Sequence, residues 1–93
     1  MRDFPAVALL ANQLMSYFGD ADDDEAIPLI REDIRSHSET KRAFREGLAQ
    51  ALADPGVDRV GLMRGCANRR AESDGQARCW LERLRDVLAD HPR

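Results

Sequence analysis

The chain has 93 residues, of which 43 % are hydrophobic and 33 % are charged, and its formal net charge is −3. A chain of this length folds around one core and leaves little room for a deep catalytic cleft. Its composition is that of a globular domain, which excludes disordered and fibrous classes. No apolar stretch approaches the roughly 20 residues of a membrane helix, and the first residues lack the layout of a signal peptide. We therefore expect a single cytoplasmic domain spanning residues 1–93.

The first predicted helix begins beside Asp3, where an acceptor side chain precedes Phe4 and Pro5, and proline suits the first turn of a helix. Gly19 is a natural end for it. Leu9 falls outside its apolar stripe. The stripe itself, at helical spacing, consists of Val7, Leu10, Ala11, Leu14 and Phe18.

A second helix is expected after the acidic run 20–25, because carboxylates stabilise the N-terminus of a helix. Pro28 is tolerated near its first turn. Its buried stripe is predicted to be Ile27, Ile30 and Ile34.

Ser38 is predicted to cap a third helix that runs to about residue 53, where the sequence Asp54-Pro55-Gly56 ends it. Gly47 lies within this helix and allows a neighbour to approach closely. The predicted apolar face is Phe44, Leu48, Ala51 and Leu52.

The C-terminal part is predicted to hold a short helix over 57–63 that closes at Gly65, a polar loop over 68–74, and a last helix. Ser73 and Gln76 fit a capping box at the start of that helix. Its predicted apolar face is Ala77, Trp80, Leu81, Leu84, Val87 and Leu88, with Cys79, Glu82 and Asp86 opposite. No segment alternates with period two, so we predict an all-α, compact bundle of four to five helices.

A calcium loop is suggested by Asp20, Asp22 and Asp24, which stand at alternate positions. An EF-hand needs glycine at its sixth position and glutamate at its twelfth, whereas this chain has Glu25 and Arg31 there. The acidic run therefore does not predict an EF-hand.

Catalytic and metal-binding patterns are not evident. Cys66 and Cys79 do not form zinc-ligand spacings with His37 or His91. The sequence contains no glycine-rich phosphate loop and no nucleophile elbow. We expect no catalytic residues, no bound metal, no cofactor and no small-molecule substrate.

The charge distribution is more informative. Residues 20–33 contain seven acidic residues and one arginine, whereas residues 34–93 contain twelve basic and nine acidic ones. An exposed leucine ringed by carboxylates suits a site for a basic protein, because charge steers the encounter and the apolar side chain anchors the complex. A solvated helix face would explain the same pattern. The candidate partner-binding residues are Asp22, Asp23, Asp24, Glu25, Leu29, Glu32 and Asp33.

An alternative is a small DNA-binding or antitoxin-like regulatory protein that uses its C-terminal arginines. These are Arg59, Arg64, Arg69, Arg70 and Arg78. The negative net charge disfavours it, because nucleic-acid binders need a broad basic surface. The loop 68–74 is also too long for a helix-turn-helix.

Two stretches resemble the CdiI-type immunity proteins of bacterial contact-dependent growth inhibition systems. One runs from Phe4-Pro5 to Tyr17-Phe18, followed by acidic residues before Ala26-Ile27. The other comprises Gly65-Cys66, a polar spacer, Asp74-Gly75 and Trp80-Leu81. The chain departs from that pattern at Asn68-Arg69-Arg70, where an aromatic–proline element is expected.

The resemblance implies a cytoplasmic protein that binds the cognate C-terminal toxin domain delivered by neighbouring bacteria. It implies neutralisation by stoichiometric binding, without catalysis. Many such toxins are nucleases with basic surfaces, which agrees with an acidic inhibitor.

Overall fold

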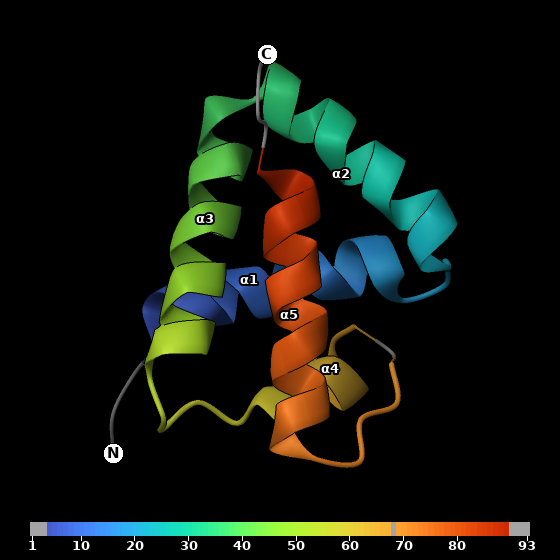
Figure 1. Ribbon diagram of the computed structural model, residues 1–93. Helices are drawn as coiled ribbons and strands as arrows, with labels where there is room; N and C mark the ends of the chain where they lie inside the picture. The colour runs from blue at the N-terminus through green and yellow to red at the C-terminus, as the bar shows by residue number, and fades with distance from the viewer. Residues whose placement is uncertain (1–3, 68, 90–93) are drawn as a thin grey trace.

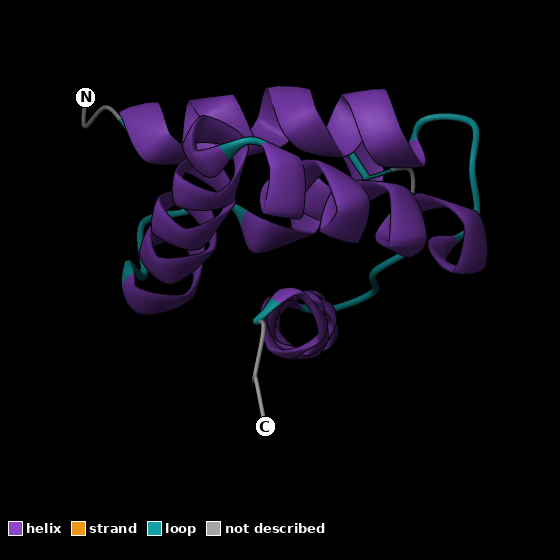
Figure 2. Cartoon of the chain, turned by 90° about the horizontal axis from the view of Figure 1, so that it is seen from above, coloured by secondary structure: helices purple, strands orange, loops and turns teal. Residues whose placement is uncertain are grey.

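The computed structural model describes residues 4–67 and 69–89, and within them the chain forms five α-helices joined by loops (Figure 1). The helices are α1 (Pro5–Phe18), α2 (Asp23–Ser36), α3 (Ser38–Ala53), α4 (Arg59–Gly65) and α5 (Asp74–Leu88). No strand occurs in this part of the chain, as Figure 2 shows. The prediction of an all-α single domain is therefore confirmed. None of the described helices is both long and apolar enough to cross a membrane.

The helices are arranged around one core. α3 and α5 pack against each other and run in roughly opposite directions, α1 crosses behind them, and α2 borders both on one side (Figure 1). The largest fully buried side chains come from three of these helices, namely Leu10, Leu14 and Phe18 of α1, Ile30 of α2 and Leu81 of α5. The predicted face of the third helix is buried in full, and Leu9 is exposed. In the predicted stripe of the first helix, Val7 and Ala11 are only partly buried against the core.

Gly47 marks the crossing of α1 and α3. A Cβ atom at this position would lie 2.6 Å from the Cβ atom of Leu10 and 2.8 Å from the carbonyl oxygen of Ala6. These distances are shorter than any normal packing contact, so only glycine lets the two helices approach this closely. The predicted role of Gly47 is confirmed.

Two predicted helix starts require correction. Ser38 is the first residue of α3 and not its cap, since His37 occupies the N-cap position without a capping hydrogen bond from its side chain. α4 begins at Arg59, two residues later than predicted, because the carboxylate of Asp58 accepts a hydrogen bond from the Gly61 amide at 2.9 Å and caps the helix there. The proposed cap at Asp3 lies outside the described residues.

The capping box of α5 is half confirmed. The Ser73 hydroxyl accepts a hydrogen bond from the Gln76 amide at 3.2 Å, as predicted. The Gln76 side chain, however, accepts from the amide of Glu72 at 2.9 Å and not from that of Ser73.

Two predicted buried faces are narrower than expected. Val87 is 40 % exposed, because it lies at the edge of α5 where no helix covers it, and Trp80 is partly exposed. Ile27 is also only partly buried, while Ala26, which was not predicted, is fully buried. The buried side of α2 is therefore rotated toward Ala26, Ile30 and Ile34.

Candidate functional site

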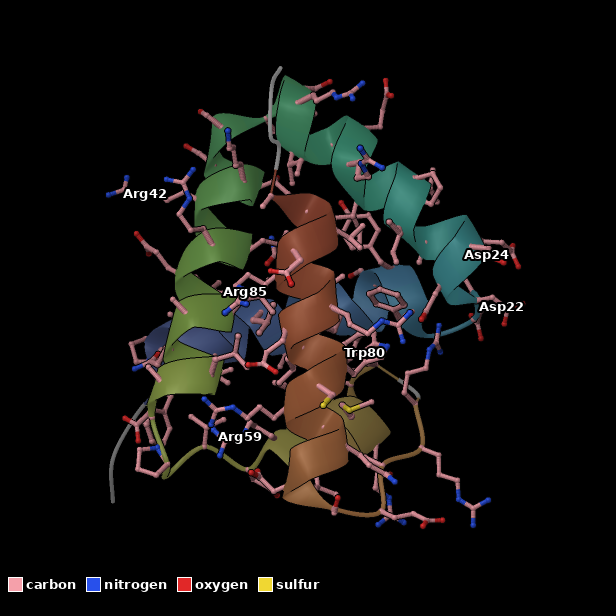
Figure 3. All side chains as sticks on the ribbon, viewed as in Figure 1. Asp22, Asp24, Arg42, Arg59, Trp80 and Arg85 are labelled. Atoms are coloured by element: carbon pink, nitrogen blue, oxygen red, sulfur yellow. The ribbon has the colours of Figure 1, made fainter. Side chains whose placement is uncertain are left out.

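Five of the seven predicted partner-binding residues are exposed on α2 or immediately before it. Leu29 is 57 % exposed, as are Leu9 and Met15 of α1 to a similar extent, but Leu29 has exposed carboxylates one helical turn away on either side. Figure 3 shows Asp22 and Asp24 at the start of α2, directed away from the rest of the molecule. We refer to the five exposed residues as the acidic face: Asp22, Asp24, Glu25, Leu29 and Glu32.

Asp23 is partly buried, and its carboxylate is engaged by other side chains of the fold. One carboxylate oxygen accepts a hydrogen bond from Arg69 at 2.8 Å, and the other lies 3.4 Å from the indole nitrogen of Trp80. Arg69 also donates to the carbonyl oxygen of Ala21 at 2.8 Å, and its guanidinium lies 5.1 Å from the centre of the Phe18 ring. Trp80 packs edge-on against the same ring at 5.2 Å. Asp23 therefore ties the start of α2 to α5 and to the loop before it, while its side chain remains 39 % exposed.

Asp33 is likewise engaged inside the molecule. Its carboxylate accepts a hydrogen bond from the hydroxyl of Tyr17, which joins α2 to α1. Burial and this contact raise the pKa of Tyr17 from 10.0 to about 12. The placement of Asp33 on the exposed face is therefore corrected.

The sequence contained a signal for both corrections. Asp23 stands four and seven positions before Ile27 and Ile30, and therefore lies in register with the isoleucine stripe. Asp33 stands seven positions after Ala26 and three after Ile30, on the other border of the buried side. A carboxylate in register with buried residues requires an internal partner, because burying an unpaired charge is costly.

Arg59 is a structural residue that the sequence analysis placed among surface arginines. It is only 7 % exposed, and it makes two hydrogen bonds to the carboxylate of Asp74, at 2.8 and 3.0 Å. It also donates to the carbonyl oxygen of Ala51 at 2.8 Å. Figure 3 places it between the end of α3 and the start of α5. Arg59 therefore clamps three helices together.

The electrostatics of this clamp follow from its geometry. The guanidinium of Arg59 lowers the pKa of Asp74, and the carboxylate in turn raises the pKa of Arg59. Because Arg59 and Arg69 both serve the interior, two of the five arginines that the DNA-binding alternative requires are not part of a free basic surface.

The chemistry of the remaining polar residues is limited. Cys66 is half-buried and Cys79 is exposed, and both are free thiols. Within residues 4–67 and 69–89, no group of three His, Cys, Asp or Glu side chains converges as a metal site would.

No family model, curated protein or solved structure matches this chain. The functional argument therefore depends on its own residues. Asp22, Asp24 and Glu25 stand at the N-terminus of α2, where carboxylates stabilise a helix, whereas Leu29 and Glu32 lie beyond the first turn and are exposed.

Proposed function

We propose that this protein is a cytoplasmic immunity protein that neutralises a basic, nuclease-type toxin domain by binding it through the acidic face. The observation that carries the proposal is Leu29, which is 57 % exposed and lies one helical turn from the exposed carboxylates of Glu25 and Glu32. The resemblance to CdiI-type immunity proteins of contact-dependent growth inhibition supports the same function.

The carboxylates of the acidic face and its leucine would each contribute to binding a basic protein. Its carboxylates attract a cationic surface and accelerate association, an effect that salt screens. Leu29 would lose its contact with water on docking, and buried apolar anchors contribute most of the free energy of binding at an interface. A nuclease holds its substrate through cations, so an acidic inhibitor competes with the phosphate backbone for the same side chains.

The rest of the fold holds this face in place. Asp23 and Asp33 attach α2 to its neighbours through Arg69 and Tyr17. The exposed residues between them are therefore presented on a fixed helix, which reduces the entropy lost on binding.

The proposal requires a gene for a large secreted protein beside this one. The experiment uses the C-terminal domain of that protein and measures association and dissociation rates at two salt concentrations. We expect the double variant Glu25→Lys, Glu32→Lys to associate at least about 10-fold more slowly at low salt. Leu29→Ala should mainly accelerate dissociation, by roughly 5- to 30-fold, which corresponds to about 1–2 kcal/mol.

A matched control reverses two exposed carboxylates elsewhere, Glu46→Lys and Glu72→Lys, with the same change in net charge. Among the residues that the structure describes, Glu46 pairs only with Arg42, on the exposed side of α3, so little stability is lost. Circular dichroism confirms that each variant is folded. If the acidic-face variants and the control bind alike, or if the wild-type protein does not protect cells from the toxin domain, the proposal is wrong.

A further inference from the structure

Two adjoining hollows lie where the end of α5 meets α3 and the C-terminal half of α2. Their volumes are about 270 and 340 Å³, and both are lined by Ile34, Lys41 and Leu88. The smaller hollow lies between α3 and α5, which run in roughly opposite directions (Figure 1). We call it the basic groove: its base is formed by Phe44, Leu48 and Leu88, and its charged side chains are Lys41, Arg45 and Arg85.

The charged side chains of the basic groove are all cations. Lys41 and Arg45 stand one turn apart on α3, and Arg85 lies on the side of α5 that faces α3 (Figure 3). All three are exposed, and no Asp or Glu is among the described residues that line either hollow. In the part of the chain that the structure describes, Lys41 and Arg45 form no ion pair, and Arg85 pairs only with its exposed neighbour Asp86, at 3.2 Å. The fold itself therefore leaves most of this positive charge without a partner.

The base of the basic groove is apolar and is contributed by both helices. Phe44 and Leu48 come from α3, and Leu88 comes from α5. Beside them Ala49 and Ala89 are exposed and small, so the rims are low at these positions. A helix laid between α3 and α5 would contact apolar side chains of both, in the manner of a helix bound in a groove.

The larger hollow extends the cationic surface onto α2. Arg31 and Arg35 line it together with Lys41, and both arginines are exposed and form no ion pair among the described residues. They follow Leu29 by two and six positions, which is roughly half a turn around the helix axis. The cations therefore lie on the side of α2 opposite the acidic face, and the two surfaces are separate.

We propose that the basic groove binds an acidic amphipathic helix of a second protein. A stripe of apolar side chains on that helix contacts the base, and carboxylates on the two borders of the stripe face Lys41 and Arg45 on one rim and Arg85 on the other. A small anion engages only one or two of these cations, and a nucleic acid leaves the apolar base without a partner. Because the groove is separate from the acidic face, the inference does not depend on the proposed function.

The test uses a synthetic peptide of about 18 residues, about 27 Å long as a helix. It carries leucines on one stripe, glutamates on both borders of the stripe and alanines elsewhere. Its binding to the full chain is measured by fluorescence anisotropy. At low salt we expect a dissociation constant of roughly 10–100 μM, as for a small transient interface, and at high salt a value at least about 10-fold higher. If the peptide does not bind at low salt even at about 1 mM protein, the inference is overturned.

Two further ligands separate an amphipathic helix from other anions. A second peptide replaces each leucine by alanine and so keeps the charge and the preference for a helix. It should bind at least about 10-fold more weakly, because the apolar anchors are lost. A short DNA duplex supplies negative charge without apolar side chains. If either ligand binds as tightly as the leucine peptide, the groove recognises charge alone and the inference is wrong.

Charge reversal locates the site. The variant Lys41→Glu, Arg45→Glu brings like charges together, so the leucine peptide should bind at least about 10-fold more weakly. The matched control Arg64→Glu, Arg70→Glu changes the net charge equally at exposed residues outside both hollows, and should bind nearly as well as the wild type. Circular dichroism establishes that both variants are folded. An equal loss in the two variants, or an unchanged affinity in the folded groove variant, contradicts the inference.

Discussion

Gly47→Ala tests the close crossing of α1 and α3. In an open helix this substitution stabilises by about 1 kcal/mol, because alanine loses less backbone entropy than glycine. In α3 the new Cβ atom would meet the Cβ atom of Leu10 at 2.6 Å and the backbone oxygen of Ala6 at 2.8 Å. Neither atom is the end of a flexible side chain, so the helices themselves must move.

The magnitude follows from the size of that movement. To reach ordinary contact at 3.4 Å, the Leu10 contact must open by about 0.8 Å. A gap of this size forfeits about a quarter to a half of the dispersion energy of each atom pair along the crossing. Overpacking of a core typically costs about 1–3 kcal/mol, and we place this case at the upper end because the new Cβ atom meets the Cβ atom of Leu10 and a backbone oxygen of α1, neither of which can rotate away. After the gain in helix preference, we expect a net loss of about 2 kcal/mol.

The assay is thermal and urea unfolding, with Gly65→Ala as the matched control. A Cβ atom at Gly65, the last residue of α4, meets nothing within 4 Å. The control should therefore leave stability unchanged or raise it by up to about 1 kcal/mol. Gly47→Ala should lower the melting temperature by about 8–16 °C. If both variants gain stability equally, α1 and α3 do not cross as closely as described.

Three further predictions concern titration and core packing. Tyr17 is the only tyrosine, so ultraviolet absorbance should show its ionisation near pH 12 in the folded protein and near pH 10 in urea. Asp33→Asn should lower the pKa of Tyr17 in the folded protein only partway toward 10, because burial raises this pKa more than the contact with Asp33 does. Since this raised pKa favours the neutral hydroxyl, the associated stability is present below pH 10 and lost toward pH 12. Because the pKa of Asp74 is lowered, Asp74→Asn should be less stable than the wild type near neutral pH, and the difference should shrink as the pH falls below 3.8. Leu84→Ala should cost about 2–5 kcal/mol in urea unfolding, whereas Leu29→Ala should change stability little, and equal effects would contradict their burial.

The sequence predicted those elements whose signal lies within the element itself. The helical spacing of Leu10, Leu14 and Phe18 identified the core side of α1 because burial repeats with the period of the helix. The turn at 54–56 and the hydroxyl of Ser73 marked helix ends because their chemistry is local. These features do not depend on what the helix packs against.

The predictions were wrong at residues whose burial depends on a distant part of the chain. The sequence places Arg59 among the surface arginines, yet the approach of α3 and α5 buries it between carbonyl oxygens and Asp74. Val87 was predicted to be buried, yet it lies at the edge of α5 and remains 40 % exposed. The two hollows that share Ile34, Lys41 and Leu88 could not be predicted for the same reason, since the residues that line them come from three helices that only the fold brings together.

The acidic segment shows why composition alone misjudges a binding surface. The seven carboxylates of residues 20–33 look alike in sequence, but the fold uses Asp23 and Asp33 as internal acceptors for Arg69 and Tyr17. Each of these two carboxylates has a partner with a defined position, and so fixes the rotation of α2 about its axis. That rotation in turn exposes Leu29 and directs the remaining carboxylates to solvent. A substitution of Arg69 should therefore weaken binding through the acidic face without touching it, because the helix that presents the face would lose its anchor.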